Sequence, residues 1–289
     1  MPGAEEGPVA LKNFGLHTAL HDLGVAWQDD PAVLHAQERA VYENLPPLGS
    51  AERRAIVLRQ CRSLSHSVER AVIGGSLPVV IGGDHASAAG SLAGFARATG
   101  AHGRIGVVWI DAHSDINTPD TSPSQALHGM PVAALLGLGD PAFAQIGGEA
   151  PVLTPDNIIY TGLRSVDPGE IRRIRDLGIT AFLIERADIE GWRVAFLDAV
   201  RRVAAQTDYL VLSIDMDAFD PSIAPSVGSP EQHGFFGSDL LPVLAEIAQV
   251  HAPDMIEIAE FNPRLPGAEK TYHLLCDVLR AVLPRHEKI

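Results

Sequence analysis

The sequence has few cysteines and no long hydrophobic run. Only Cys61 and Cys276 occur among its 289 residues, too few for the disulfide framework of a small secreted protein. No uninterrupted apolar stretch reaches the ~18 residues that a membrane-spanning helix needs. The first residues include Glu5 and Glu6, whereas a secretory signal peptide begins with basic and then apolar residues. We therefore expect a cytoplasmic protein of a reducing compartment, without a membrane partner.

Basic residues are also scarce relative to acidic ones. The chain has 22 lysines and arginines against 36 aspartates and glutamates, which gives a formal net charge of −14. Nucleic acids and anionic membranes bind basic surfaces, so this balance argues against both classes of partner. It favours a cationic ligand or bound metal cations. The hydrophobic content of 46% is enough for a sizeable core and argues against a disordered chain.

Short apolar runs alternate with longer stretches of helical periodicity. The predicted strands are 78–82, 105–110, 157–162, 179–184, 208–214 and 254–260. The predicted helices are 52–75, 86–99, 168–177, 189–206, 238–250 and 268–283, with Ser238 and Asp239 as the cap of the fifth. This alternation indicates an α/β fold with a parallel sheet covered on both faces. Because no repeat or linker interrupts it, and 137–157 is the only long irregular stretch, we expect one domain over residues 1–289.

Polar residues that can bind a metal follow three of the predicted strands. In a parallel sheet, ligands bind beyond the carboxyl ends of the strands, which makes function more probable at these positions. The first segment is Ile81–His85, where Gly-Gly-Asp-His follows an apolar residue. Its glycines permit a tight turn and a close approach of the backbone to a site. A lone histidine there is more often a helix-start residue, so both interpretations of His85 stay open at this point.

Two further segments place acidic residues at alternate positions. Asp111, His113 and Asp115 follow the second predicted strand, and side chains two residues apart in an extended segment point to the same side. A capping turn is also rich in aspartate, but three alternating ligand types favour a site. Asp215 and Asp217 follow the fifth strand, and their like charges repel unless a cation or a proton lies between them.

Together these segments offer six potential metal ligands: His85, Asp111, His113, Asp115, Asp215 and Asp217. Six ligands with four carboxylates are too many for a tetrahedral zinc ion, and no thiolate is among them. Carboxylate-rich sets suit hard divalent ions, and two ions are needed to use all six ligands. Two such ions lower the pKa of a water molecule between them, which yields a hydroxide nucleophile near neutral pH. The sequence therefore predicts metal-assisted hydrolysis.

The three segments resemble the signatures of the arginase and agmatinase (ureohydrolase) family. Those signatures are Gly-Gly-Asp-His, Asp-Ala-His-x-Asp and Ser-(Ile/Phe)-Asp-x-Asp-x-x-Asp-Pro, and the likeness extends from Glu5 to about residue 280. It implies a three-layer α/β/α sandwich with a mainly parallel sheet of about eight strands. It also implies two Mn²⁺ ions, with Co²⁺ or Ni²⁺ as alternatives, held by the six ligands and bridged by Asp111 and Asp215.

Within this family, the loops 115–131 and 161–170 resemble those of arginases. The resemblance implies cleavage of a small cationic guanidino substrate, L-arginine, to L-ornithine and urea by a metal-bridging hydroxide. It further implies a homo-oligomer, either a trimer or a hexamer.

The same resemblance assigns roles to individual residues. The catalytic residues would be His128 as proton shuttle, Glu260 at the guanidinium end, and the ligand Asp115. The substrate-binding residues would be Asn117, Ser124, Asp167, Glu170 and Ser229. The first two would hold the α-carboxylate, and Asp167, with Glu170 acting through water, would face the α-amino group. Ser229 stands where arginases usually carry threonine, and its hydroxyl keeps the hydrogen bond.

Some of these residues have simpler interpretations. Without the family, His128 before Gly129 would be a loop residue and Glu260 a structural carboxylate at a strand end. Asp84 is interpreted as orienting a ligand rather than binding metal. Asp220, which precedes a proline, is interpreted as a turn residue.

Several departures from the family pattern leave the substrate open. Ala126 replaces an asparagine that helps arginases to hold the α-carboxylate, and Gln125 and His233 stand where glycine is common. The alternatives are a related amidino hydrolase, acting on a guanidino acid, agmatine, N-hydroxyarginine or formiminoglutamate, and a catalytically silent metal-binding homologue. The strand that precedes Glu5 in the family is also missing, which is consistent with a shortened chain, a misplaced start or a sheet completed in another way.

Overall fold

Six parallel strands form one sheet in the computed structural model, which describes residues 3–27, 46–184 and 188–283. The strands are β1 (Val79–Ile81), β2 (Ile105–Ile110), β3 (Ile158–Leu163), β4 (Thr180–Leu183), β5 (Tyr209–Asp215) and β6 (Met255–Ala259). Their order across the sheet is β1-β6-β5-β2-β3-β4, and every neighbouring pair is parallel. All six predicted strands are confirmed to within one residue at each end. The family resemblance implied about eight strands, and the described residues form six.

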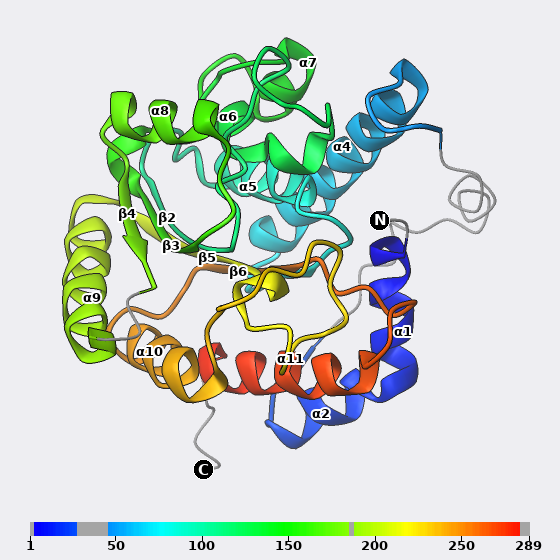
Figure 1. The fold of residues 1–289 in the computed structure, drawn as a ribbon, viewed down its shortest axis with the longest axis vertical. Helices are drawn as coiled ribbons and strands as arrows, with labels where there is room; N and C mark the ends of the chain where they lie inside the picture. Colours follow the sequence, from blue (N-terminus) through cyan, green and yellow to red (C-terminus); the bar gives the residue numbers. More distant parts are fainter. Residues whose placement is uncertain (1–2, 28–45, 185–187, 284–289) are drawn as a thin grey trace.

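Helices cover both faces of the sheet, which confirms the three-layer α/β/α architecture (Figure 1). One layer contains α4 (Ala51–Ile73), α5 (Ser87–Thr99), α6 (Pro131–Leu135), α7 (Pro141–Ala144) and α8 (Pro168–Leu177). The other contains α1 (Gly7–Phe14), α2 (Leu16–Asp22), α9 (Ile189–Gln206), α10 (Gly237–Val250) and α11 (Ala268–Val282). The six helices predicted from periodicity are all present.

The sheet separates two hydrophobic cores because alternate side chains of each strand point to opposite faces. On β2, Val108 and Ile110 pack with the α9–α11 layer, whereas Val107 and Trp109 pack with the α4–α5 layer. All six residues of this strand are buried. Burial on both faces explains why the central strands are continuous apolar runs in the sequence.

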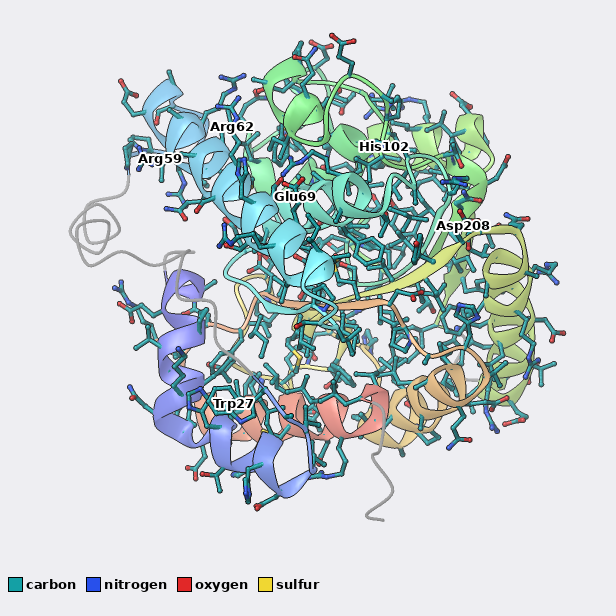
Figure 2. The ribbon with its side chains drawn as sticks, turned by 180° about the vertical axis from the view of Figure 1, so that it is seen from behind. Trp27, Arg59, Arg62, Glu69, His102 and Asp208 are labelled. Atoms are coloured by element: carbon teal, nitrogen blue, oxygen red, sulfur yellow. The ribbon has the colours of Figure 1, made fainter. Side chains whose placement is uncertain are left out.

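Helices α4 and α5 pack at unusually close range. A Cβ atom on Gly90 would lie 2.4 Å from the Cys61 carbonyl oxygen, and one on Gly94 would lie 2.1 Å from that of Ser65. Only glycine permits this approach of the two backbones. An ion pair of 2.7 Å between Arg97 and Glu69, which Figure 2 labels on α4, joins the helices farther along. The close packing fixes the first turn of α5, which follows the Gly-Gly-Asp-His segment.

Two details differ from the sequence prediction. Helix α10 begins at Gly237, and Asp239 is its third residue, whose Oδ2 accepts the Phe236 backbone N–H at 3.0 Å. The stretch 137–157 is not uniformly irregular, because it contains α7, which Asp140 caps. The segment between β2 and the 3₁₀ turn Leu127–Gly129 is comparably irregular, and it carries the predicted substrate loop.

Within the described residues, no helix combines the length and the apolar character that crossing a membrane requires.

Candidate metal and substrate site

The six predicted metal ligands lie together at the carboxyl edge of the sheet. His85 follows β1, and the three ligands after β2 face the two at the end of β5, because β2 and β5 are neighbours. Five of the six side chains are buried, and only His113 is partly exposed. The local cause is that the parallel strands β1, β2 and β5 all end at the same edge of the sheet, so the polar residues at and after their carboxyl ends meet there.

His85 is at the centre of the first group of ligand atoms. Its Nδ1 lies 2.9 Å from Asp111 Oδ2, 3.2 Å from Asp115 Oδ2 and 3.3 Å from Asp215 Oδ2. His85, Asp111 and Asp215 each offer an atom within 4.8 Å of the others, a spacing that one ion can fill. Three carboxylates around one imidazole nitrogen are a set that suits a hard divalent cation.

His113 forms the second group with Asp111 and Asp217. Its Nδ1 lies 3.1 Å from Asp217 Oδ2 and 3.5 Å from Asp111 Oδ1. Asp111 therefore belongs to both groups, with one oxygen toward each histidine, which is the geometry of a bridging carboxylate. Asp215 lies in the first group only, and its Oδ1 accepts the Asp217 backbone N–H at 2.7 Å. The bridging role assigned to Asp215 stays a prediction.

Burial and crowding shift the pKa values of the carboxylates in this cluster. Burial and the charge of Asp111 raise the pKa of Asp115 to about 7 and that of Asp217 to about 6. Burial and the charges of Asp217 and Asp111 raise the pKa of Asp215 well above its usual value. For Asp111, burial acts in the same direction, but hydrogen bonds from His113 and His85 outweigh it and lower the pKa.

For the two histidines, burial acts in the opposite direction and lowers the pKa. Burial alone would lower the pKa of His113, but its hydrogen bonds to Asp111 and Asp217 raise it to about 12. Burial would also lower the pKa of His85. Hydrogen bonds to three carboxylates outweigh this effect and raise the pKa well above its usual value. The cluster thus retains protons among groups that would be deprotonated as metal ligands. Cation binding would displace those protons, which makes it dependent on pH.

Trp109 is part of the site, although the sequence analysis did not single it out. Its indole Nε1–H donates to Asp111 Oδ2 at 3.0 Å, and its ring stacks on the His85 imidazole with centroids 4.2 Å apart. Trp109 and Asp111 are two residues apart at the end of β2, and that alternation was the available signal. Arg164 was also missed. Its guanidinium donates to the carbonyls of Asp217, Glu231 and Gln232, and so holds the loop beside the cluster.

His128 and Glu260 lie beside the ligand cluster and contact each other. His128 Nδ1 is 3.3 Å from Glu260 Oε1, and the same oxygen accepts the His85 backbone N–H at 3.1 Å. A Cβ atom on Gly228 would lie 2.4 Å from Glu260 Oε2, so a larger residue here would require this carboxylate to shift. Asp84 is close enough for its charge to act on His128, and burial raises its pKa.

The predicted substrate loop is braced by its own polar side chains. The Asn117 amide donates to Asp167 Oδ2 at 3.0 Å and accepts the Thr121 hydroxyl at 2.8 Å. Asp167 is the N-cap of α8, so the loop and the first turn of this helix form one unit. Ser124 is exposed at the rim, and its Oγ accepts the Ala126 backbone N–H at 3.3 Å.

Glu170 lies behind this loop. Its carboxylate accepts the backbone N–H groups of Asp167 and Ile116 at 3.0 and 3.2 Å, and only 4% of the residue is exposed. The carboxylate therefore supports the loop, and its predicted contact with substrate through water remains untested. Ser229 is half-buried and follows Gly228 beside Glu260. Asp220 is confirmed as a turn residue, because its carboxylate accepts backbone N–H groups of Ser222 and His233.

Left-handed backbone conformations gather around this site. Among the described residues, those other than glycine with positive φ are Asp115 (51°), Gln125 (57°), His233 (67°) and Glu260 (66°). Such conformations cost energy and persist where the surrounding structure enforces them, which is typical of functional sites. The first and last are predicted catalytic residues. At Gln125 and His233 the left-handed backbone explains why glycine is common in the resembling family.

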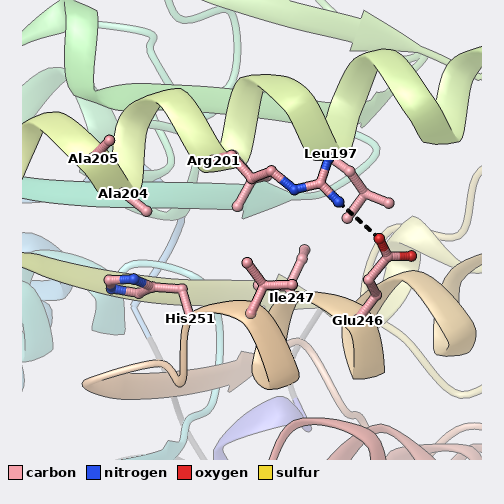
Figure 3. Close-up of a pocket in the computed structure, with 9 residues that line it drawn as sticks. Leu197, Arg201, Ala204, Ala205, Glu246, Ile247 and His251 are labelled. Carbon is pink, nitrogen blue, oxygen red and sulfur yellow. Dashed lines mark hydrogen bonds and ion pairs between the residues drawn. The ribbon is translucent and has the colours of Figure 1, made fainter.

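A groove of about 200 Å³ between α9 and α10 is separate from this site (Figure 3). Its lining is largely apolar, with Leu197, Ile247 and an ion pair of 2.9 Å between Arg201 and Glu246. It contains none of the predicted site residues, so the chemistry is assigned to the carboxyl edge of the sheet.

Comparisons with known proteins agree with this geometry. Residues 1–284 match the sequence model of the arginase family. The chain is 36% identical to an arginase of Bacillus caldovelox over 276 residues, which are 93% of this chain and 88% of that protein. Its fold is similar to that of an arginase of Bacillus subtilis, with a TM-score of 0.84, 30% identity, and 97% and 92% of the two chains covered. An Entamoeba histolytica arginase solved with L-ornithine is similar at a TM-score of 0.82 and 28% identity, over 98% and 92% of the chains.

Proposed function

The chain belongs to the arginase family, and from this premise we propose that it is a binuclear manganese hydrolase that cleaves L-arginine to L-ornithine and urea. The observation that carries the proposal is the pair of ligand groups that share Asp111. A shared carboxylate with an imidazole on either side is an arrangement for two neighbouring ions. Relatives of this family are hydrolases of guanidino C–N bonds, and the ornithine complex of the Entamoeba relative is consistent with this product.

The donor set fits manganese. Four carboxylates and two imidazole nitrogens are oxygen-rich and lack thiolates, which favours hard divalent ions over zinc in a closed tetrahedral site. His85 and His113 would each hold one ion, with Asp111 between them and Asp115, Asp215 and Asp217 completing the set. When bound, the two ions supply a hydroxide nucleophile at neutral pH and stabilise negative charge on the reacting centre.

His128 and Glu260 provide the remaining chemistry from the protein itself. Hydrogen bonding to Glu260 raises the pKa of His128 to about 9, although burial opposes the shift. His128 therefore carries a proton at neutral pH and can donate it to the amine that leaves as ornithine. The buried Glu260 carboxylate carries a negative charge next to this histidine and would attract the guanidinium of the substrate.

The far end of the substrate would lie along the braced loop. Asn117 and Ser124 would bind the α-carboxylate, and Asp167 would face the α-amino group, with Glu170 holding this arrangement from behind. Ser229, near Glu260, would contribute a hydroxyl. The amide of Asn117 is already oriented by Asp167 and Thr121, so the loop is preorganised before any ligand binds.

One observation favours a second candidate within the same chemistry. Ala126 is only 3% exposed and offers no side-chain donor where arginases carry an amide. A substrate without an α-carboxylate would lose nothing at this position. Agmatine or another amidino compound is therefore the second candidate.

Steady-state turnover of the manganese-loaded protein tests both candidates. The panel is L-arginine, agmatine, a guanidino acid, N-hydroxyarginine and formiminoglutamate, with release of urea, hydroxyurea or formamide as the readout. Cobalt- and nickel-loaded protein serve as metal controls. We expect the highest kcat/KM with L-arginine. Higher kcat/KM with agmatine would select the second candidate, and absence of turnover with every compound would refute both.

A further inference from the structure

Arg173 reaches from α8 into the predicted substrate loop, although no motif of the sequence marks it. Its Nη1 donates to the Ile116 carbonyl at 2.6 Å, and its Nη2 donates to the Thr118 hydroxyl at 3.2 Å. The side chain is half-buried, and among the described residues no carboxylate forms an ion pair with it. A guanidinium is best suited to carboxylates and phosphates, whereas the partners here are neutral oxygens of one loop. The role of this arginine therefore lies in that loop.

One face of α8 holds both polar backbone groups of Ile116. Glu170 Oε1 accepts the Ile116 N–H at 3.2 Å, and Arg173 donates to the Ile116 carbonyl. Because Glu170 and Arg173 are three residues apart, they lie on the same face of the helix. The two side chains together form a clamp on this one backbone residue.

Ile116 lies between a predicted metal ligand and a predicted substrate residue. Asp115, which precedes it, has a φ of 51°, a conformation that persists where the surrounding structure enforces it. The other side of the segment is held by the backbone. The Val132 N–H donates to the Asp115 carbonyl, and the Asn117 N–H donates to the Gly129 carbonyl, both at 3.0 Å. The segment is thus fixed between α8 on one side and the start of α6 on the other.

Arg173 also acts on the side chain of Asn117 through a threonine. An arginine can only donate, so the Thr121 hydroxyl, 3.5 Å from Nη1, accepts there. Its own proton goes to its nearest acceptor, Asn117 Oδ1, at 2.8 Å. Asn117 Nδ2 then faces Asp167 Oδ2 at 3.0 Å. The amide of Asn117 therefore has one orientation relative to the loop.

We propose that Arg173 is a positioning residue for substrate binding, which clamps the Ile116 backbone together with Glu170 and so holds Asn117 in place for the far end of the substrate. Its contacts within the described part of the chain are with the loop and not with the ligand cluster. Arg173 therefore acts on substrate binding and not on the chemical step. The inference deepens the proposed function and rests on its substrate site.

Steady-state kinetics of Arg173→Met with L-arginine test the proposal. Methionine keeps an unbranched side chain but has no proton to donate. Hydrogen bonds from a charged group are stronger than neutral ones, so we expect KM to rise about tenfold. Since the reacting groups are not touched, kcat should change by about twofold at most. The manganese content should equal that of the unmodified protein.

Arg172→Met is the matched control, because it removes the same charge from the same helix. Arg172 is exposed and has no hydrogen bond or ion pair in the part of the chain that the structure describes. Its KM should equal that of the unmodified protein. Arg173→Lys keeps the charge but not the planar fork of donors, so it should raise KM by an intermediate factor of about threefold. It also decides the case if thermal unfolding shows that Arg173→Met is not folded.

Amide hydrogen exchange gives a second readout, which needs no turnover. Residues 115–121 should exchange about tenfold faster in Arg173→Met than in the unmodified protein, because the clamp that protects them is open. Residues 105–110 of β2 should exchange at the same rate in both proteins.

Three results would overturn the proposal. The first is an unchanged KM in a folded Arg173→Met, and the second is a kcat that falls as much as kcat/KM. The third is an unmodified KM in Arg173→Lys beside a raised KM in Arg173→Met, because the charge alone would then suffice. If the unmodified protein releases no urea from L-arginine, the proposed function fails separately. Faster exchange of residues 115–121 in Arg173→Met would then still support the clamp, and unchanged exchange would refute it.

Discussion

Glu260 keeps His128 in its protonated form. The two side chains are 3.3 Å apart, and hydrogen bonding and charge raise the pKa of the imidazole to about 9 against the opposing effect of burial. Glu260 has a left-handed backbone, which its N–H helps to hold by donating to the Gly83 carbonyl at 2.8 Å. The pair thus combines a proton donor with a charge that attracts a guanidinium, at the edge of the ligand cluster.

Replacing His128 by asparagine should remove the proton donor and leave the metal ligands in place. General acid catalysis contributes about 10²–10⁴-fold, so we expect kcat to fall by that factor with little change in KM. Metal content, measured by mass spectrometry, should stay the same. His273→Asn is the matched control, since His273 is an exposed residue of α11. Wild-type kcat in His128→Asn would show that another group moves the proton.

Activity should decline on the alkaline side as His128 loses its proton. Because the pKa is raised to about 9, the protonated donor persists through neutral pH and is lost above about pH 9. In Glu260→Gln the main cause of the shift is removed, so the alkaline limb of kcat should move toward the ordinary histidine pKa of about 6.5. The pH profile of kcat for both proteins is the measurement. Identical alkaline limbs would contradict the role of Glu260.

The same pair also contributes to stability, with a definite sign. A group whose folded pKa is raised binds protons more tightly when folded, so its contribution is complete below the unfolded value of about 6.5. It disappears as the pH rises through about 9. The Tm of the unmodified protein should therefore exceed that of Glu260→Gln, and this difference in Tm should become smaller as the pH rises between these two values.

Loss of a ligand shared by the two groups should affect metal binding differently from loss of a ligand that belongs to one group. Asp111 belongs to both, so Asp111→Asn should weaken both ions, whereas His113→Asn should leave one ion near His85. Mass spectrometry of dialysed protein gives the stoichiometry. Binding at 100 times Kd stabilises a folded protein by about 2.7 kcal/mol, so adding Mn²⁺ to chelated protein should raise Tm. Two retained ions in Asp111→Asn would contradict the shared position of this residue.

Much of this arrangement could be predicted from local sequence patterns. The central strands β2, β3, β5 and β6 are predictable because burial on both faces requires continuous apolar runs. The ligands after β2 are predictable because alternate residues of an extended segment share a face. The structure brings those ligands together as expected, and their metal-binding role remains a prediction.

Features that depend on register or on backbone conformation could not be predicted in this way. Trp109 on β2 lies beside Ser213 on β5, which lies beside Glu257 on β6, and this alignment of three strands is encoded by no single segment. The left-handed backbone at Gln125 and His233 could not be predicted either, because glutamine seldom adopts it and histidine, although enriched there, adopts it only uncommonly. Only the glycines common in the resembling family pointed to these two positions.

Gln125 and His233 share a left-handed backbone but differ in their side-chain contacts, so the two positions can be compared by mutation. The Gln125 amide donates to the carbonyls of Pro119 and Ser122, both at 2.7 Å, and so closes the substrate loop on itself. The Gln125 Cβ also lies close to Gly49, just before α4, because a Cβ atom on Gly49 would be only 2.9 Å from it. His233 is exposed, its backbone N–H donates to Asp220, and its side chain has no hydrogen bond within the described part of the chain. The first side chain braces the loop, and the second has no comparable contact.

Glycine at the two positions should therefore have different consequences, for stability at one and for substrate binding at the other. His233→Gly relieves a strained φ and loses no side-chain bond, so we expect a gain of up to about 1 kcal/mol in the free energy of unfolding, or about 2–4 °C in Tm. Gln125→Gly relieves similar strain but frees the loop that carries Asn117 and Ser124. Loss of about 1 kcal/mol of hydrogen bonding corresponds to an increase in KM of about fivefold, with kcat unchanged. Substrate kinetics and thermal unfolding of both variants give the answer, and an unchanged KM in Gln125→Gly would show that the loop holds its shape without this side chain.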